Sequence, residues 1–336
     1  MKKKVCLPFE NKPYTLMYHN LAFPNGIIQG NAAEDITPWL CGKYLNCLLH
    51  KNSTAMNRFN ICVSDNWAVH DGILFRQRLD VFPEMFNLIC GDYVSFFRKM
   101  IAMGNYVKGT YNEEFIPGKS NYNKKYFFHD FLLIGYNDAT GNFISVGYLK
   151  DQKFQRFLIP YDNMRNAIVS MKQSKLCFDF LKYNSFAQYT LGMNRIISEL
   201  NDYISSTTSM KISLAGKYWG LDAIQHLGCV FEDNARKGEL IDVRYTRGLM
   251  EHKFFMQMRI NYLHAHGYID VAHARDLSEQ IYKMSTQVHL LAIKYNISGN
   301  KTIGVNIKER INAIVQIERE YLPIVLEKLQ KRAAEV

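Results

Sequence analysis

The hydrophobic pattern of this chain changes near residue 170, and that change limits the folds it can adopt. Before it, short alternating apolar runs are separated by turn signals, as in "YFFHDFLLIGYNDATGNFISVGYLKDQKFQRFLIP". After it, apolar residues recur at spacings of three and four in long stretches such as "RYTRGLMEHKFFMQMRINYLHAHG". The first spacing places side chains on one face of a strand, and the second places them on one face of a helix. We therefore expect an α+β fold class, with an α+β domain over residues 1–170 followed by an all-helical domain over residues 171–336.

Local signals refine the first of these domains. "NDATGN" between two alternating runs predicts a β-hairpin, and "KDQ" after the second run predicts another tight turn. Helices are expected over Thr37–His50 and Pro83–Met103, where apolar residues follow the helical period. In the first of them Thr37 can cap the helix and Pro38 suits its first position.

Composition excludes several classes of protein. The chain has 336 residues, of which 48% are hydrophobic and 21% charged, and this balance is typical of a globular protein. No run approaches the roughly 18 apolar residues that a membrane span needs. The start "MKKKVCLPFENKPY" is basic but has no apolar segment behind it, so no secretory signal is expected. The seven cysteines are an odd number without CxxC spacing, which favours reduced thiols and a cytoplasmic location.

The net charge of +10 favours acidic partners. The basic residues are spread along the chain, and no Lys/Arg-rich block, zinc-finger spacing or aromatic RNA-binding string occurs. Charge alone does not separate nucleic acid from small acidic proteins, but this spread disfavours nucleic acid. We expect neither nucleic acid nor a membrane as a partner, whereas an acidic carrier protein of thiotemplated biosynthesis fits a diffuse positive surface.

His129 lies at the front of a strongly apolar strand and is the first candidate for the site. In a strand His129, Phe131 and Leu133 share one face, and Asp130 lies on the other. A general base needs an imidazole that its surroundings hold with one ring nitrogen aimed at the group to be deprotonated. The strand by itself favours an ordinary structural histidine, so the catalytic interpretation depends on finding a nucleophile.

Cys41 is the candidate nucleophile. It falls in the first turn of the helix expected from Pro38, and Gly42 after it leaves room for a substrate. A helix N-terminus presents free N–H groups and the positive end of the dipole, which lower a thiol pKa and can stabilise an oxyanion. The other cysteines lie deeper in the helix or in apolar contexts and are expected in the core: Cys6, Cys47, Cys62, Cys90, Cys177 and Cys229.

A cysteine that opens a helix, followed about ninety positions later by "HDFLLIGYND" and another strand, resembles the papain-type thiol hydrolases, whose histidine strand carries H-x5-G-Y. The pattern is more similar to the bacteriocin-processing (C39-like) peptidases and their biosynthetic relatives. These relatives include the N-terminal domain of the butirosin acyltransferase and the amide-forming enzymes of closthioamide biosynthesis. The resemblance covers roughly residues 1–170 and implies a papain-like (C39-like) cysteine-protease fold with Cys41 as nucleophile and His129 as base.

Two features depart from the family pattern. The place of the orienting Asp or Asn holds "VGYLKD", so the third catalytic member is Asp151, Tyr148 through its hydroxyl, or none. The family's oxyanion-stabilising Gln precedes the cysteine by a few residues, but here Gln29 lies twelve residues upstream. Asn31 is the alternative donor.

The resemblance implies a cysteine-dependent acyltransferase that forms amides. An acyl group would pass from a phosphopantetheine thioester on a carrier protein to Cys41 and then to a small amine or diamine. A thioester is already activated, so no cofactor is expected. A C39-like cysteine peptidase and a non-catalytic binding protein on the same fold are the alternatives.

Weaker motifs do not change this expectation. "PGKS" lacks the glycine that a phosphate-binding loop needs, because Glu113 stands in its place. His264 and His266 diverge on a helix, and no HExxH or paired CxxC occurs, so no metal site is expected. The "EEF" run at Glu113–Phe115 is expected to be a solvated loop.

Overall fold

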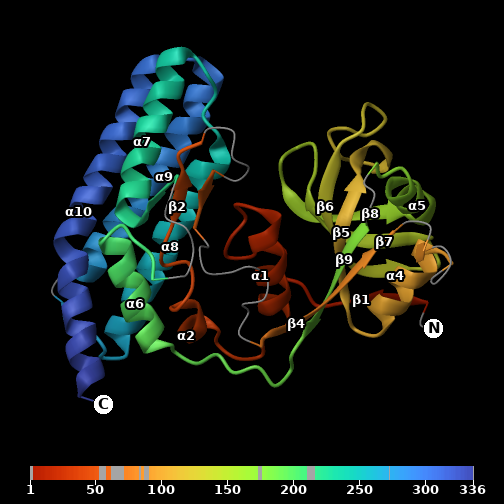
Figure 1. Cartoon of the computed structure of the whole chain (residues 1–336), viewed down its shortest axis with the longest axis horizontal. Coiled ribbons are helices and arrows are strands. Elements are labelled where there is room, and N and C mark those ends of the chain that lie inside the picture. The colour runs from red at the N-terminus through yellow and green to blue at the C-terminus, as the bar shows by residue number, and fades with distance from the viewer. Residues whose placement is uncertain are drawn as a thin grey trace. The chain divides into compact units, whose positions relative to one another are not determined.

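The chain forms two compact units, seen here in a computed structural model (Figure 1). Unit 1 comprises Met1–Ala33 and Asn66–Gln188, and unit 2 comprises Glu34–Asp65 and Tyr189–Val336. The expected boundary at residue 170 thus lies inside unit 1, and residues 34–65 join the C-terminal helices. The structure describes residues 3–52, 58–61, 72–82, 85–86, 91–172, 176–209, 216–271 and 273–335.

Unit 1 is built on a seven-stranded antiparallel sheet, so the mixed α+β class is confirmed for this part of the chain. The strand order is β4-β9-β5-β6-β7-β8, and β1 pairs with β6 beside this path. The two hairpins expected from the turn signals are present as β6-β7 and β7-β8. The strands are β1 (Lys4–Cys6), β4 (Leu74–Val81), β5 (Tyr106–Asn112), β6 (Phe128–Asn137), β7 (Asn142–Tyr148), β8 (Phe154–Pro160) and β9 (Leu176–Tyr183).

Helices α4 (Tyr93–Ala102) and α5 (Tyr161–Val169) cover the aromatic core of unit 1. The ring of Phe97 in α4 lies 5.2 Å from that of Phe178 and 6.2 Å from that of Phe131. Within the helix expected over Pro83–Met103, α4 begins at Tyr93, where Asp92 caps it by accepting a hydrogen bond from the Ser95 backbone N–H at 3.0 Å. Residues 83, 84 and 87–90 lie outside the described residues.

The glycine of the H-x5-G-Y pattern is Gly135, and the structure gives it a packing role. The short strand β1 pairs with the second half of β6, with Cys6 opposite Gly135. A Cβ on Gly135 would lie 2.4 Å from the Val5 carbonyl oxygen, so only glycine lets β1 approach. The β6-β7 register also shifts between Leu133 and Gly135. The first half of β6, which carries His129, is therefore left to pair with β5.

Unit 2 is a bundle of helices with a small sheet, and the helical pattern expected after residue 170 is confirmed for its residues. Two segments after residue 170 are strands instead: Leu176–Tyr183 forms β9 of unit 1, and Lys217–Trp219 forms β10 of unit 2. The helices are α6 (Met193–Ile204), α7 (Gly220–Lys237), α8 (Val243–Ala265), α9 (Ala274–Ser298) and α10 (Lys301–Ala334), and the three-stranded sheet has the order β10 (Lys217–Trp219), β2 (Leu48–His50), β3 (Phe59–Asn60).

The helix expected over Thr37–His50 is wrong. Helix α2 is a single turn, Thr37–Leu40, after which the chain turns through Tyr44 at a φ of +55° and enters β2. The buried Arg259 of α8 donates hydrogen bonds at 2.6 Å to the carbonyl oxygens of Cys41 and Lys43. This tertiary contact takes acceptors that a continuing helix would use for itself.

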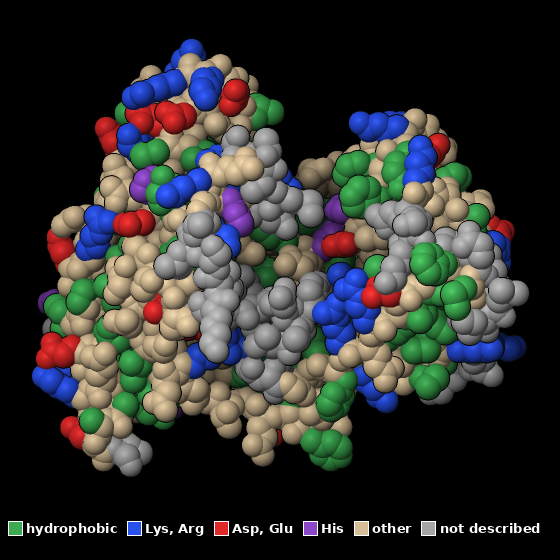
Figure 2. Space-filling view, in the orientation of Figure 1, with side chains coloured by type: hydrophobic (Ala, Val, Ile, Leu, Met, Phe, Trp, Pro, Cys, Tyr) green, Lys and Arg blue, Asp and Glu red, His purple; other side chains and the backbone are tan. Residues whose placement is uncertain are grey.

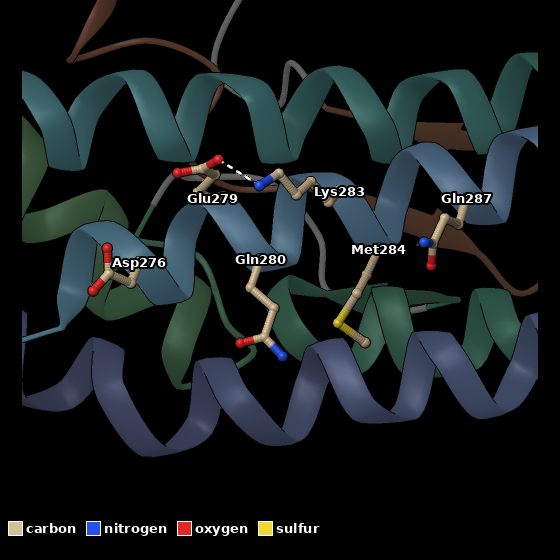
Figure 3. Close-up of a pocket in the computed structure, with 6 residues that line it drawn as sticks. All are labelled: Asp276, Glu279, Gln280, Lys283, Met284 and Gln287. Carbon is tan, nitrogen blue, oxygen red and sulfur yellow. Dashed lines mark ion pairs between the residues drawn. The ribbon is translucent and has the colours of Figure 1, made fainter.

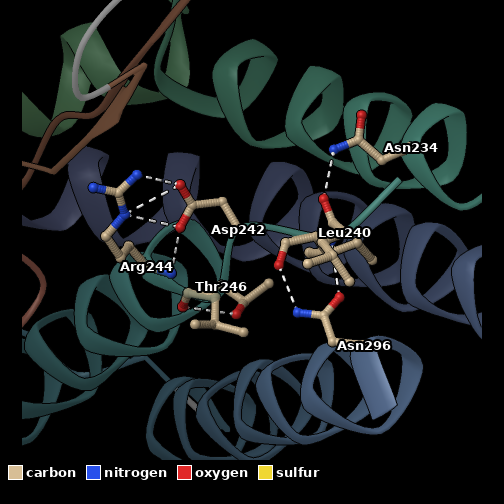
Figure 4. A network of polar contacts seen from close by, with 8 residues as sticks. Asn234, Leu240, Asp242, Arg244, Thr246 and Asn296 are labelled. Carbon is tan, nitrogen blue, oxygen red and sulfur yellow. Dashed lines mark hydrogen bonds and ion pairs between the residues drawn. The ribbon is translucent and has the colours of Figure 1, made fainter. Parts of the chain in front are cut away.

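Hydrogen bonds from polar side chains stabilise the connection between α7 and α8 (Figure 4). Asn296 of α9 both donates to and accepts from the backbone of Ile241, at 2.8 and 2.9 Å. Asp242 caps α8 by accepting from the Arg244 backbone N–H at 2.9 Å. These bonds satisfy backbone groups that the end of one helix and the start of the next leave free.

Within the described residues, no helix is long and apolar enough to cross a membrane.

A charged pair lies in the core of unit 2. Lys253 of α8 donates to both carboxylate oxygens of Glu318 of α10, at 2.8 and 2.7 Å, and both side chains are fully buried. The Tyr203 hydroxyl accepts from Lys253 at 2.7 Å and donates to Glu318 at 2.7 Å. Each charge therefore depends on its partner for the hydrogen bonds that water would otherwise supply.

We expect Glu318→Leu to lower the free energy of unfolding by about 3–5 kcal/mol, because it leaves a buried ammonium without its counter-ion. The double variant Lys253→Met/Glu318→Leu should recover most of that loss. Urea unfolding followed by circular dichroism measures both. Glu327→Gln is the control, because it removes an exposed ion pair with Lys331 that is worth about 0–1 kcal/mol. A single variant as stable as this control would contradict the prediction.

Candidate active site

The imidazole of His129 is paired with the carboxylate of Glu113. His129 is the second residue of β6, and its partner across the ladder in β5 is Tyr111. Two residues after Tyr111 the chain enters the short 3-10 turn η1 (Glu113–Phe115), which brings the Oε1 atom of Glu113 to 2.7 Å from Nδ1 of His129. The strand pairing is thus what places the two side chains together.

Glu113 is held by several groups at once. Its backbone N–H donates to the Phe127 carbonyl at 2.8 Å, and its Oε2 atom accepts from the Asn121 side chain at 2.9 Å. Burial raises the pKa of Glu113, but the hydrogen bonds from His129 and Asn121 outweigh it, so this pKa lies below 4.5. The ionised carboxylate accepts a hydrogen bond from the Nδ1–H tautomer of His129, and in this tautomer the Nε2 atom carries the lone pair that can take a proton.

Lys119 is a buried lysine next to the pair formed by His129 and Glu113. Its Nζ atom donates to the Tyr148 carbonyl at 2.6 Å and lies 3.9 Å from Oε1 of Glu113. The ammonium also lies over the ring of Phe157, 5.1 Å from its centroid. Burial lowers the pKa of Lys119 to about 8, against the opposing effect of Glu113. Lys119 thus brings a buried hydrogen-bond donor close to Glu113 and His129.

His19 is the first residue of α1 (His19–Asn31) and lies against His129. The two ring centroids are 4.8 Å apart, and the His19 ring also stacks on Phe23 at 4.7 Å. Burial, and then the neighbouring charges of His129 and Lys119, hold the pKa of His19 well below 6.5. The side chain is therefore a neutral imidazole at neutral pH. Its Nε2 atom is buried and has no hydrogen-bond partner.

A pocket of about 180 Å³ opens beside these groups. His129 is about one-third exposed, whereas Glu113 is almost wholly buried, so the imidazole is accessible and the carboxylate that contacts it is not. This division suits general-base catalysis, because the reacting nitrogen must meet a substrate while its partner stays fixed. The pocket is lined by Glu113, Lys119, Ser120, Asn121, Phe127, His129, Tyr148, Leu149 and Gln152.

The residue that orients His129 is Glu113, and the expectation that the "EEF" run is a solvated loop is wrong. Asp151, one of the two proposed third members, lies exposed on the turn after β7 and accepts from the Lys153 backbone N–H at 3.1 Å. Tyr148, the other, does line the pocket, but its hydroxyl donates to the Leu16 carbonyl. Glu113 was missed because only the β5-β6 register reveals that it is near His129.

Gln29 and Asn31 lie at the other end of α1 from the site. Gln29 accepts from the Tyr14 backbone N–H at 2.9 Å, and Asn31 donates to the Tyr106 hydroxyl at 2.8 Å. At 1.5 Å of rise per residue, the ten residues from His19 to Gln29 span about 15 Å of helix axis. Both side chains therefore hold the N-terminal segment in place, and neither reaches His129.

Cys41 lies in unit 2, at the C-terminal end of α2 rather than in the first turn of a long helix. The thiol is buried, and burial raises its pKa to about 11 in spite of the nearby Arg259. The helix that starts beside His129 is α1, and it opens with His19 and Asn20. His129 belongs to unit 1, so a joint action of Cys41 and His129 stays a prediction.

A second hollow, on the surface of unit 2, is a weaker candidate for a site. A hollow of about 390 Å³ lies along α9, where the exposed Glu279 and Lys283 pair at 2.5 Å (Figure 3). All six of its lining residues come from that one helix. Within the described parts of the chain, no group of three or more His, Cys, Asp or Glu side chains is arranged to hold a metal ion. The pocket of His129 is therefore the best candidate for an active site.

Glu113→Gln should lower the free energy of unfolding by about 1–3 kcal/mol near pH 7, because it removes a charge-assisted hydrogen bond. The pKa of Glu113 is lower in the folded protein than its ordinary 4.5, so its contribution is present above pH 4.5 and is lost as the pH falls through the folded value. The stabilities of wild type and variant should therefore converge in acid. Urea titrations over a pH series test this, with Glu114→Gln as control, and a constant difference at all pH values would contradict it.

Comparison with known proteins assigns no family to this geometry. A scan against models of protein families found no match to the chain, and a search of curated proteins found none either. The papain-like resemblance of residues 1–170 stays a prediction.

Proposed function

We propose that this protein is an acyltransferase that moves an acyl group from a carrier-protein thioester to an amine, with His129 as the general base. The observation that carries the proposal is the 2.7 Å contact between Nδ1 of His129 and the buried Glu113 carboxylate, in a pocket that leaves the imidazole accessible. A carboxylate in this position fixes the tautomer and orientation of a catalytic histidine.

The reaction needs one proton carrier and no cofactor. Nε2 of His129 takes a proton from the attacking amine as its nitrogen forms a bond to the thioester carbonyl carbon. When the carbon–sulfur bond breaks, the same proton passes to the leaving thiolate. The products are an amide and a free thiol, so atoms and charges balance. Phe127 and Leu149 at the pocket help to exclude the water that would otherwise compete with the amine.

The partner expected from charge is an acidic carrier protein. The net charge of +10 favours its approach, and Figure 2 shows Lys and Arg side chains distributed over the visible surface of each unit. A distributed charge of this kind accelerates encounter without requiring one basic patch.

The acyl group can reach the amine directly or through an acyl-Cys41 intermediate. The buried thiol with a pKa of about 11 favours the direct route, since only the thiolate is a good nucleophile. The acyl-Cys41 route is what the papain-like resemblance implies. The two routes differ in whether the protein itself gains the mass of an acyl group.

A non-catalytic binding protein is the second candidate. One observation favours it: the helix that starts beside His129 opens with His19 and Asn20, neither of which is a nucleophile of the kind that the resemblance implies for Cys41. On this alternative the pocket would bind an acyl group or amine without turning it over.

We expect His129→Gln to lower the rate of amide formation by about 10²–10⁴-fold, because it removes the general base and keeps a side chain of similar polarity. The assay mixes the full-length chain with acyl-loaded carrier proteins and a diamine and follows the amide by mass spectrometry. His266→Gln, at an exposed histidine of unit 2, is the control. If wild type forms no amide with any carrier but binds the acyl group, the binding protein is favoured instead.

Cys41→Ala separates the two routes. On the direct route the variant keeps the wild-type rate, and intact wild type gains no acyl mass. An acyl adduct on wild type that is absent from Cys41→Ala would instead establish the covalent route. Circular dichroism confirms that the variant is folded.

A further inference from the structure

His19 and Lys119 converge on the backbone of Gly147 in β7. A Cβ built on Gly147 would lie 3.5 Å from Nε2 of His19 and 3.7 Å from Nζ of Lys119. The two nitrogen atoms thus lie at van der Waals distance from the same point, the position that a Cβ of Gly147 would take. Gly147 has a φ of +152°, a conformation that other residues rarely adopt. Glycine is commonly found where a ligand must approach the backbone closely.

His19 has an unmet hydrogen-bonding need at this point. Its side chain is more than nine-tenths buried, and Nε2 has no partner. Buried polar atoms in folded proteins are nearly always paired, so an unpaired one needs an explanation. Because its pKa is held well below 6.5, the ring is neutral and carries one N–H at neutral pH. As the Nε2–H tautomer, His19 can donate to an oxygen atom that a ligand brings.

Lys119 supplies the second donor. An ammonium has three N–H groups, of which one donates to the Tyr148 carbonyl and another faces Glu113 at 3.9 Å. The third is available for a ligand. Lys119 also lines the pocket, together with His129, so an oxygen bound by it would lie close to the proposed base.

We propose that His19 and Lys119 form the oxyanion site of this protein and bind the thioester carbonyl oxygen of the acyl donor beside Gly147. This inference rests on the acyl-transfer function proposed above. It assigns to these two residues the role that the resemblance implies for Gln29, with Asn31 as the alternative donor. Donors aimed at the place where charge develops stabilise the transition state more than the ground state.

The geometry also explains why two adjacent histidines differ in environment. His129 is partly exposed and paired with a carboxylate, so it can accept a proton. His19 is buried without a carboxylate and stays neutral, so it can donate a hydrogen bond without losing its proton. A neutral imidazole near a helix start is a known form of electrophilic catalyst, and different environments commonly divide roles in this way.

Butyrate is a suitable probe, because its carboxylate oxygens mimic the charge of the oxyanion. Its binding to the full-length protein is followed by NMR of ¹⁵N-labelled histidine side chains. We expect a saturable shift of the His19 signal in wild type, accompanied by a shift of the neighbouring His129 signal. The His129 signal, which both variants retain, should report at least about tenfold weaker binding in His19→Phe and Lys119→Met, each of which removes one donor. Phenylalanine keeps the ring stacking with Phe23, and methionine keeps the packing against Phe157.

His266→Phe and Lys124→Met are the matched controls, because both residues are exposed and lie outside this cluster. They should bind butyrate as wild type does. If all four variants bind equally, or if wild type shows no saturable His19 shift, the proposed oxyanion site is wrong. If circular dichroism shows that His19→Phe is not folded, the comparison of Lys119→Met with Lys124→Met tests the proposal.

The rate of amide formation separates this inference from the proposed function. If both hold, His19→Phe and Lys119→Met lower kcat by about 10²–10³-fold, the usual effect of removing one oxyanion donor, and leave KM for the amine unchanged. If wild type forms amide and these variants keep its rate, only the oxyanion role fails. Binding of butyrate through His19 without any amide formation would overturn the acyltransferase function and leave an anion-binding site.

Discussion

The pairing of β5 with β6 is the constraint on which the site depends. It sets Tyr111 opposite His129, and two residues later the 3-10 turn delivers Glu113 to the imidazole. Because strand registers change in whole residues, a slip of one position would move His129 to the opposite face of the sheet. The apolar residues that share its face, such as Phe131 and Leu133, lie in the aromatic core and hold the register. Core packing and the contact between His129 and Glu113 are therefore fixed by the same hydrogen-bonded ladder.

The parts of the fold that could be predicted are those whose partners lie near in the sequence. Alternating apolar residues and the "NDATGN" turn predicted the β6-β7 hairpin, since adjacent antiparallel strands need only a short turn between them. The segment 34–65 could not be predicted in the same way. Its helix ends after one turn and the Cys41 and Lys43 carbonyls meet Arg259, more than 200 residues later in the chain. Local helix propensity carries no information about a contact between residues so far apart in the sequence. The predicted position of Cys41 in the first turn of a long helix is therefore wrong.

The same distinction applies to the site. His129 was found because a histidine at the front of an apolar strand is conspicuous, whereas Glu113 resembles any acidic residue before a turn. Lys119 belongs to the "PGKS" run, which was set aside because it lacks a nucleotide-binding glycine. Its burial against Phe157 and its bond to the Tyr148 carbonyl follow from packing alone. Polar residues are common next to strand ends, so the sequence by itself does not distinguish Glu113 from the others.

The placement of His19 changes how the resemblance to thiol hydrolases is best understood. A cysteine at a helix start would supply both a nucleophile and N–H donors for an oxyanion, whereas the helix that starts beside His129 opens with the neutral imidazole of His19. A neutral imidazole can serve only the second of these tasks while His129 acts as base. A substrate that is already activated, such as a thioester, needs less from the protein than an amide does, because its leaving group departs readily. An amine that attacks directly could then replace the missing nucleophile, and the remaining requirement is the stabilisation of negative charge on the carbonyl oxygen. His19 and Lys119, which face the same point on Gly147, are placed to meet that requirement.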